Sequence, residues 1–398
     1  MRIALIADTF PPQRTSGAVQ LRDLVREFAR QGHHLTVLLP APDLAAPWKM
    51  DDFDGVEVLW LKAPRTKDIG YLRRALAEFA MPFVMRTSLA KSPLANVQWD
   101  GVIWYSPSIF FGPLVRSLRA ESGCKSYLII RDIFPQWAAD MGLMRRGPAY
   151  YLLHKIAQFQ YSVADVIGVQ TPGNLAYFTS WMRRYPDRHI QVLANWLGAP
   201  GALRSTIDFS QTTLKGRKIF VYAGNMGVAQ NMDVIVELAN FLRHDTSIGF
   251  ALVGRGSERM RLEAVAASME LDNLLCFNEI DPDEIPSLYA QATAGIVTLD
   301  PRHRSHNIPG KFISYMQCGL PVLANVNQGN DLVSLINECN VGVVAENAEA
   351  PRLSILVNKL LSCIDDEVIT AERCQSLFAR DFAVEATVET ILEHLQGP

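Results

Sequence analysis

Residues 308–322, with the sequence IPGKFISYMQCGLPV, decide the fold that this chain is expected to adopt. The pattern predicts a loop, a helix that begins near Gly310, a glycine at the end of that helix, and a buried strand from Pro321. Lys311 falls in the first turn of the helix, where the helix dipole disfavours a cation unless an anion is bound nearby. The stretch therefore indicates a βα unit with an anion-binding end, with a solvated surface lysine as the alternative.

Short apolar runs rich in β-branched residues alternate with longer helical patterns along the chain. This alternation is typical of βα units on parallel sheets. The predicted strands fall into two series, of which the first comprises residues 2–7, 34–39, 56–61, 101–105, 126–130, 166–169 and 191–193. The second series comprises residues 218–223, 249–253, 274–277, 294–298, 321–325 and 342–345. The segment 195–202 between the two series is rich in Gly and Pro, which indicates a domain boundary.

We therefore predict an α/β fold, with two Rossmann-like, doubly wound parallel-sheet domains that face each other across a cleft. The predicted domains are residues 1–198 and 199–380, followed by a C-terminal segment, 381–398, whose helix could pack back on the first domain. Ligands of open α/β sheets bind outside the carboxyl ends of the strands. The loops at these ends are therefore the places where functional residues are expected.

The composition of the 398 residues is that of a globular protein too long for one hydrophobic core, with 49% hydrophobic and 20% charged residues. The six cysteines are scattered and have neither C-x-x-C nor zinc-site spacing, so we interpret them as reduced thiols and expect no metal site. The sequence has no apolar run of the roughly 20 residues that a membrane-spanning helix requires, and residues 1–7 look like a first strand rather than a signal sequence. We therefore expect a cytoplasmic protein.

The net charge of −3 conceals an asymmetry, because residues 1–198 carry a net charge of +7 and residues 199–398 one of −10. A basic domain indicates an anionic partner, either a membrane surface or a nucleic acid, and an uneven distribution of charge without function is the alternative. Residues 71–86, YLRRALAEFAMPFVMR, interleave aromatic residues and Met with Arg, as at the interface of an anionic bilayer. A helix packed on its own domain would show a similar pattern. Because the aromatic residues form no stacking platform with the basic ones, we expect peripheral membrane contact and no nucleic acid.

Three loops after predicted strands offer contacts to phosphate groups. In the first, Gly17 opens a helix, where free backbone amides and the helix dipole favour an anion; an ordinary turn glycine is the alternative. In the second, Gly224 and Gly227 follow strand 218–223 without the G-x-G-x-x-G spacing of a dinucleotide site, which argues against a dehydrogenase. In the third, Arg255 lies between two glycines after strand 249–253, and we expect it to bind phosphate.

The order of four sequence blocks resembles that of glycosyltransferase family 4, over nearly the whole chain. The blocks are YAGNMG at 222–227, VGRG at 253–256, DEIPSLY at 283–289 and YMQCGLPV at 315–322. Within this family, RDIFPQW at 131–137, GNMGVAQ at 224–230 and PGKF at 309–312 resemble the O-antigen transferases that handle N-acetyl-fucosamine and related amino sugars. The resemblance implies a GT-B fold, a UDP-sugar donor without a further cofactor, a polyprenyl-diphosphate-linked saccharide acceptor, and transfer with retention and without a metal.

The chain departs from the family pattern at positions that usually bind the nucleotide. The family's Arg and Lys, which clamp the diphosphate, fall on Asn225 and Gln230, and its two glutamates eight residues apart fall on His306 and Ser314. A diphosphate still needs charge-assisted donors, so the binding must be arranged differently. The donor-binding residues that we then expect, with Lys311 and Arg255 supplying the missing charge, are Gly224, Asn225, Gly227, Gln230, Arg255, Lys311, Phe312, Ser314 and Tyr315.

Arg131 and Asp132 follow strand 126–130 and are therefore expected to point into the cleft. Asp132 could orient the acceptor hydroxyl or accept its proton, and Arg131 could hold a phosphate or a neighbouring carboxylate. A buried ion pair between the two residues is the alternative. Asp52 and Asp54 form the D-x-D pattern that binds a divalent metal in another transferase class, but they precede Gly55 and a strand, as in an ordinary polar turn. We expect catalysis to involve Arg131 and Asp132 without a metal.

Two other functions are compatible with the same architecture. A non-hydrolysing UDP-sugar 2-epimerase would need acid and base groups around the sugar ring, and the chain offers only Asp132 and His306 for that role. A catalytically silent sugar-nucleotide-binding protein is suggested by Ser314 in place of the glutamate that the family uses for the ribose. We expect a glycosyltransferase that transfers an amino sugar.

Overall fold

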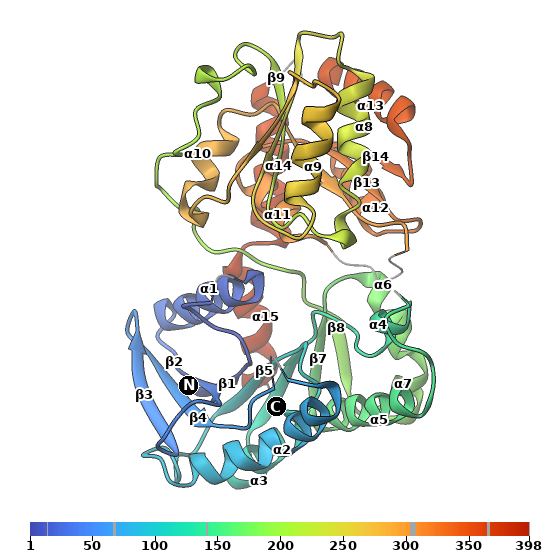
Figure 1. The fold of residues 1–398 in the computed structure, drawn as a ribbon. Coiled ribbons are helices and arrows are strands. Elements are labelled where there is room, and N and C mark those ends of the chain that lie inside the picture. The colour runs from blue at the N-terminus through green and yellow to red at the C-terminus, as the bar shows by residue number, and fades with distance from the viewer. Residues whose placement is uncertain (14, 67–68, 141, 303–307, 364–366, 398) are drawn as a thin grey trace. The chain divides into compact units, whose positions relative to one another are not determined.

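The computed structural model describes residues 1–398 except 14, 67–68, 141, 303–307, 364–366 and 398 (Figure 1). The chain divides into two units. Unit 1 comprises Met1–Gly198 and Val384–Pro398, and unit 2 comprises Ala199–Ala383. We describe each unit by itself.

The described residues of unit 1 form an eight-stranded sheet with the strand order β3-β4-β2-β1-β5-β6-β7-β8. All neighbouring strands are parallel except β3 and β4, which are antiparallel. The elements are β1 (Arg2–Ile6), α1 (Ser16–Arg30), β2 (His34–Ala41), β3 (Trp48–Phe53), β4 (Val56–Lys62), α2 (Tyr71–Leu89), β5 (Gly101–Tyr105), α3 (Gly112–Ser122), β6 (Lys125–Ile129), α4 (Gln136–Asp140), α5 (Pro148–Val163), β7 (Val166–Val169), α6 (Pro172–Leu175), the 3-10 helix Ala176–Phe178, α7 (Thr179–Arg184), β8 (His189–Val192) and α15 (Val384–Gln396).

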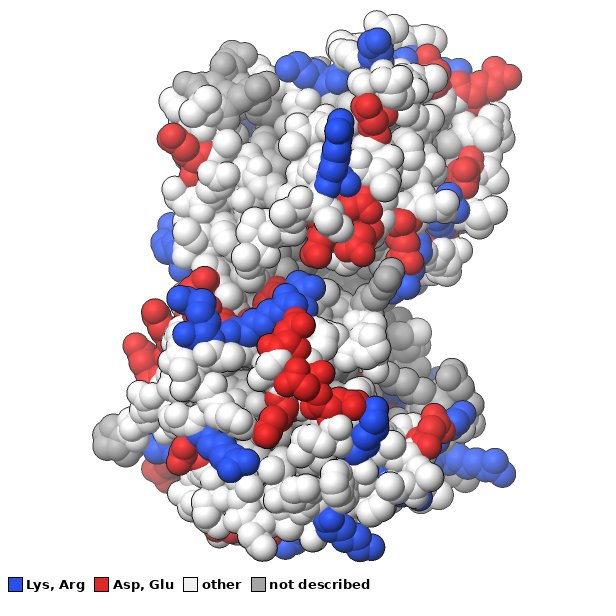
Figure 2. Space-filling model, turned by 90° about the vertical axis from the view of Figure 1, so that its left-hand side faces the viewer, with Lys and Arg blue, Asp and Glu red and all other residues white. Residues whose placement is uncertain are grey.

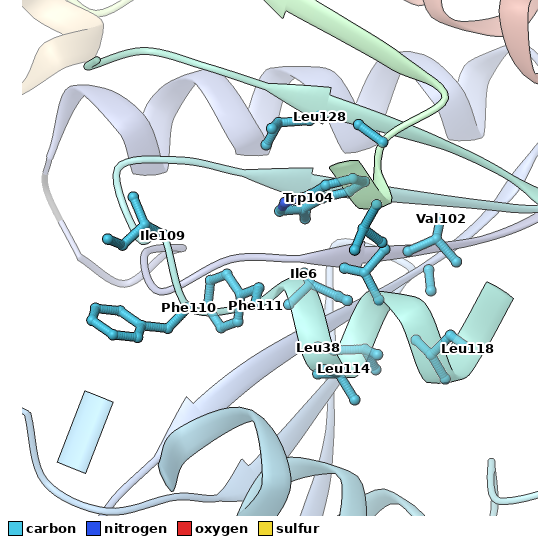
Figure 3. Packing of buried hydrophobic residues seen from close by; sticks show 14 of the residues in the cluster. Ile6, Leu38, Val102, Trp104, Ile109, Phe110, Phe111, Leu114, Leu118 and Leu128 are labelled. Atoms are coloured by element: carbon cyan, nitrogen blue, oxygen red, sulfur yellow. The ribbon is translucent and has the colours of Figure 1, made fainter. Parts of the chain in front are cut away.

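Helices cover both faces of this sheet, as the near-continuous apolar strands require. One face packs against α2, α3 and α5, and the other packs against α1 and α15 (Figure 1). Figure 3 shows the first layer from close by, with Trp104 and Val102 of β5 above Leu114 of α3 and Phe111, the residue that precedes α3. Because Trp104 and Phe111 are fully buried, this layer fixes α3 and its neighbours rigidly on the sheet.

The described residues of unit 2 form a six-stranded parallel sheet with the order β11-β10-β9-β12-β13-β14. The order reverses between β9 and β12, which is the topological switch point of a doubly wound sheet. The elements are the 3-10 helix Phe209–Gln211, β9 (Lys218–Ala223), the 3-10 helix Val228–Gln230, α8 (Asp233–Phe241), β10 (Ile248–Val253), α9 (Arg259–Ser268), β11 (Leu274–Phe277), the 3-10 helix Pro282–Glu284, α10 (Ile285–Tyr289), β12 (Ala294–Thr298), α11 (Gly310–Gln317), β13 (Val322–Val326), α12 (Leu332–Cys339), β14 (Gly342–Glu346), α13 (Ala350–Cys363) and α14 (Glu367–Asp381).

The fold predicted from the sequence, two Rossmann-like parallel-sheet units, is the fold observed. Strand β3 was missed, because polar residues occupy half of its positions and none of its residues is fully buried, as is typical of an edge strand with one partner. The residue assigned to the end of the second domain, 380, lies inside α14, which continues to Asp381. Phe382 still belongs to unit 2, where its ring packs on Phe312, and the return to unit 1 begins only at Val384.

Within the part of the chain that the structure describes, no helix is both long enough and apolar enough to span a bilayer.

Candidate functional site

The loops after β9 and β10 in unit 2 pack backbone against backbone through glycines. The amide of Met226 donates to the carbonyl oxygen of Arg255 at 2.7 Å, and the amide of Gly224 is likewise bonded to the end of β10. A Cβ atom on Gly254 would lie 2.0 Å from the carbonyl oxygen of Gly224, and one on Gly256 would lie 2.3 Å from that of Met226. Both positions also have φ above 140°. Only glycine permits this approach, which fixes the turn at Gly224.

Lys311 lies beside this turn, in the first turn of α11. Its Cε atom is 3.7 Å from the point where a Cβ would stand on Gly224, and its Nζ atom is 4.6 Å from the ring centroid of Tyr222. Burial lowers the pKa of Lys311 to about 8. Among the described residues the ammonium group has no carboxylate partner, so its charge is balanced only by the face of the Tyr222 ring. A half-buried cation next to a glycine turn is the arrangement that an anion would complete.

Tyr222 was not singled out by the sequence analysis, although it stands two residues before Gly224. Its hydroxyl group donates to the carbonyl oxygen of Asn225 at 2.6 Å and so stabilises the turn. The centroid of its ring lies 4.6 Å from the Nζ atom of Lys311. The side chain of Asn225 is exposed. Tyr222 is therefore the residue that connects the turn to the lysine.

Gln230 and Gly227 have a local structural role in this loop. The Oε1 atom of Gln230 accepts from the amide of Gly227 at 3.0 Å and so caps the short 3-10 helix Val228–Gln230. A Cβ on Gly227 would lie 2.9 Å from the side-chain nitrogen of Asn225. The side-chain oxygen of Gln230 and the amide of Gly227 are thus bonded to each other, and the assignment of both residues to donor binding stays a prediction.

Arg255 extends from the tip of the loop after β10 and is 57% exposed at its side chain. Its Nε atom lies 3.2 Å from Oε2 of Glu279, a carboxylate that is 46% exposed. Exposed pairs of this kind contribute about 0 to 1 kcal/mol to stability, so the pair does not hold Arg255 firmly. Arg255 therefore stands at the rim of the carboxyl edge, next to the turn.

Phe312 and Tyr315 are core residues, which corrects their assignment to the donor site. Both are fully buried. The hydroxyl group of Tyr315 donates to the carbonyl oxygens of Val221 and Ile296, at 3.1 and 3.2 Å, and its ring fills the space over Gly295, where a Cβ would lie 2.5 Å away. These side chains fasten α11 to the sheet and so position Lys311.

Ser314 lies in α11, two residues after Phe312. Its side chain is half-buried, and its assignment to the donor site stays a prediction. The other position of the family's glutamate pair, His306, lies outside the described residues.

In unit 1, Arg131 is buried at the carboxyl end of β6, whereas the sequence predicted a side chain that points into the cleft. The residue is 5% exposed, its Nη1 atom donates to the carbonyl oxygen of Leu193 at 3.3 Å, and its guanidinium group lies 4.3 Å from the ring centroid of Trp196. Its Nε and Nη2 atoms have no hydrogen-bond partner among the described atoms. Burial lowers the pKa of Arg131. The guanidinium group of Arg131 therefore packs between the rings of Tyr105 and Trp196, and its main contacts differ from the ion pair with Asp132 that was the alternative.

Asp132 and Gly17 lie close to the carboxyl edge of the unit 1 sheet. Both lie near Tyr105, a buried residue at the end of β5. Burial raises the pKa of Tyr105 to about 12, and the negative charges of Asp132 and Asp8 also raise this pKa. A Cβ on Gly17 would lie 3.2 Å from the Tyr105 hydroxyl oxygen, which shows that Gly17 permits close packing in the first turn of α1. Asp132 is only partly buried and remains the candidate for contact with an acceptor.

The D-x-D pattern belongs to the hairpin between β3 and β4. The Oδ1 atom of Asp52 accepts from the amide of Gly55 at 2.9 Å, and Asp54, in the left-handed conformation, pairs with Arg26. Across the described ranges of the chain, no three His, Cys, Asp or Glu side chains gather closely enough to hold a metal ion. The two aspartates thus have the turn role that their sequence context indicated.

Two Rossmann-like parallel-sheet units in one chain make up the GT-B fold, which solved glycosyltransferase structures share with this chain. Residues 217–363 match the family model described as "Glycosyl transferases group 1".

Two proteins of known assignment are similar over most of the chain. The putative colanic acid biosynthesis glycosyl transferase WcaI of Escherichia coli is 23% identical over 80% of this chain and 82% of that protein. The probable glycosyltransferase WbjE of Pseudomonas aeruginosa is 23% identical over 86% of this chain and 84% of that protein. Both similarities support glycosyl transfer as the activity.

Solved structures share the fold over whole chains. A sucrose-phosphate synthase of Thermosynechococcus elongatus has a TM-score of 0.71, with 16% identity over 99% of this chain and 98% of its own. WaaG, a glycosyltransferase of lipopolysaccharide biosynthesis, has a TM-score of 0.66 with 15% identity, and Anabaena HepE in complex with UDP and glucose has one of 0.67 with 14%, both covering 100% of each chain. At these identities the likeness shows the fold.

Proposed function

We propose that the protein is a glycosyltransferase of surface polysaccharide synthesis, which transfers an amino sugar of the N-acetyl-fucosamine type from UDP to a polyprenyl-diphosphate-linked saccharide. The observation that carries the proposal is the Lys311 ammonium group beside the Gly224 turn, at the switch point of the unit 2 sheet. This is where a nucleotide diphosphate would meet a cation at the carboxyl edge of the sheet.

The donor is proposed to bind along the carboxyl edge of unit 2. Lys311 would contact the diphosphate from the side of Tyr222, and Arg255, whose ion pair with Glu279 is exposed and weak, would turn to the same phosphates. These two residues take the place of the cations that the family has at 225 and 230. The complex of HepE with UDP and glucose supports UDP as the nucleotide.

The transfer step is proposed to proceed with retention and without a metal. In that reaction the leaving diphosphate oxygen takes the proton of the incoming hydroxyl on the same face of the sugar, and the protein stabilises the departing charge. Lys311 would supply that stabilisation, and Asp132 would orient the acceptor hydroxyl from unit 1. Arg131 is proposed to stabilise the loop that contains Asp132 through its buried contacts, without contacting the substrate.

The relatives support our proposal for the acceptor and for the location of the enzyme. Colanic acid and lipopolysaccharide are surface polysaccharides, which supports a lipid-linked acceptor at the inner face of the cytoplasmic membrane. We propose that the protein is cytoplasmic and contacts that membrane peripherally through residues 71–86.

The test measures donor binding and transfer separately. Thermal unfolding in the presence of a panel of nucleotides and sugar nucleotides is expected to show stabilisation by UDP and most by the UDP-linked donor. Incubation of that donor with a polyprenyl-diphosphate-linked saccharide should then give a product one amino sugar heavier by mass spectrometry. Epimerised UDP-sugar formed without any acceptor would instead support the 2-epimerase, and stabilisation by UDP without turnover on any acceptor would support a silent binding protein.

A further inference from the structure

Helix α2 exposes a row of large apolar side chains along its outer face. Leu76, Phe79 and Phe83 are 66%, 57% and 52% exposed, and the rings of Phe79 and Phe83 lie 6.1 Å apart. The opposite face of the same helix places Met81 and Met85 in the core. The exposed row therefore is not the core-facing side of the helix, and nothing in its own unit covers it among the described residues.

Helix α5 continues this apolar exposure, which the sequence analysis did not indicate. Tyr151 and Leu152 are 58% and 61% exposed. Phe159, two turns further along the same helix, is 36% exposed. Helix α3 lies between α2 and α5 on the same face of the sheet (Figure 1). On α3, Arg116 holds its guanidinium group 5.9 Å from the ring centroid of Phe159. We call the outer side of these three helices the α2–α5 surface.

Basic residues accompany the exposed apolar side chains. Helices α2, α3 and α5 contain six Arg and Lys but only two Asp and Glu. The two glutamates are already paired, Glu78 with Arg74 and Glu121 with Arg86. In the described part of the chain, Arg73, Arg116 and Lys155 have no carboxylate partner, so the α2–α5 surface carries uncompensated positive charge.

Elsewhere on the described surface of unit 1, several basic side chains have acidic partners. On the face shown in Figure 2, acidic side chains lie among the basic ones. The arginines of α1, for example, pair with carboxylates: Arg22 with Asp23, and Arg30 with Glu27. On the α2–α5 surface, exposed aromatic side chains accompany part of the excess positive charge of residues 1–198.

We propose that the α2–α5 surface docks on a bilayer containing anionic lipids, with its aromatic side chains at the headgroup level and its free cations on lipid phosphates. The proposal rests on the proposed function, since it names the surface through which a lipid-linked acceptor is reached. Helix α2 connects two parallel strands, so its first turns lie toward the carboxyl edge of the sheet, where Asp132 is found. Cations and aromatic rings together match an anionic interface, whereas a second copy of the same basic surface would be repelled.

Cosedimentation with vesicles tests this surface. The full chain is expected to pellet with vesicles of phosphatidylcholine and phosphatidylglycerol at low salt, and to stay in the supernatant with phosphatidylcholine alone or at high salt. The pairs Phe79→Glu with Phe83→Glu, and Tyr151→Glu with Leu152→Glu, should each lower the partition coefficient at least about tenfold, because each removes buried apolar contact and adds repulsion. Arg73→Gln with Lys155→Gln should lower the coefficient on anionic vesicles.

The control is Ile355→Glu in α13 of unit 2, which changes a side chain that is 67% exposed and should leave binding unchanged. Binding of the wild type to neutral vesicles, or unaltered binding of both glutamate pairs, would overturn the proposal. So would a concentration-dependent dimer that the same substitutions abolish, which would assign the surface to a second copy. Stabilisation by UDP is measured on every variant, so that a failure of the donor site is distinguished from a failure of the membrane surface.

Discussion

At the scale of single residues, the half-buried lysine predicts a pH dependence of donor binding. The pKa of Lys311 is lowered to about 8 by burial, and a bound diphosphate would raise it again because the charged form gains a partner. The affinity for UDP should therefore be full below pH 8 and fall as the pH rises above it, since a proton must then be taken up on binding. Isothermal titration from pH 7 to 9.5 in buffers of different ionisation enthalpy measures this uptake.

Replacing this lysine should remove both the affinity and the pH dependence. Lys311→Met is expected to weaken UDP binding by roughly 10- to 100-fold at pH 7, the worth of one charge-assisted hydrogen bond. Lys359→Met, on the exposed side of α13, should change neither quantity. If Lys311→Met bound UDP as the wild type does, with the same pH profile, the diphosphate contact assigned to this residue would be refuted.

Arg131 should affect stability rather than donor binding. Arg131→Ala removes a guanidinium group that lies 4.3 Å from the Trp196 ring and leaves a cavity in its place, so we expect unit 1 to lose about 2 to 4 kcal/mol of unfolding free energy. Arg116→Ala removes an exposed cation 5.9 Å from an aromatic ring and should cost about 0.5 kcal/mol or less. Denaturant unfolding measures both, and weakened UDP binding in Arg131→Ala would contradict the assignment.

At the scale of elements, the close packing of the loops after β9 and β10 predicts an unusual sensitivity to glycine replacement. Gly254→Ala would place a Cβ 2.0 Å from the carbonyl oxygen of Gly224, so the two loops must separate and the turn beside Lys311 must move. We expect a loss of more than about 2 kcal/mol in stability and a drop in UDP affinity. The second effect shows that the turn, and not only the fold, depends on the contact.

The matched control for this prediction is Gly216→Ala. Gly216 also has a positive φ, of 77°, but a Cβ there would meet nothing within 4 Å. Gly216→Ala should therefore lower the unfolding free energy only by the backbone strain, about 1 kcal/mol, and leave the affinity for UDP unchanged. Equal effects of the two replacements would mean that strain alone, without the loop contact, explains the result.

Periodicity and turn chemistry predicted most elements, because parallel βα units carry their signals locally. The helix at Gly310 with its glycine end is observed as α11, and Lys311 lies in its first turn as expected. Which side of a helix faces the core was harder to predict. Phe312 and Tyr315 were assigned to the donor site because the family motif contains them, whereas in the fold they anchor α11. The burial of Arg131 depends on Trp196, a contact that no local pattern specifies.

At the scale of the whole molecule, the chain leaves unit 1 after Gly198 and returns to it at Val384. Packing fixes the returning helix on unit 1. Leu395 of α15 lies against Gly101 of β5, where a Cβ on the glycine would be 3.0 Å from the Leu395 side chain. Ile391 is fully buried in the same core as α1. The amide of Val384 also donates to the carbonyl oxygen of Leu197 at 3.1 Å, so the outgoing and returning segments are bonded to each other. The last helix is thus a structural part of the first unit.

This connectivity predicts that a substitution near the C-terminus destabilises the N-terminal sheet. Ile391→Ala should lower the unfolding free energy of unit 1 by about 2 to 5 kcal/mol, because it empties a fully buried site, while Ile355→Ala, on an exposed position of α13, should change little. Hydrogen exchange distinguishes the units: the amides of β5 and β6 should exchange faster in Ile391→Ala, and those of β9 and β10 should not. Faster exchange in β9 and β10 alone would mean that α15 stabilises unit 2 instead, and its packing on the unit 1 sheet would then not be its main contribution to stability.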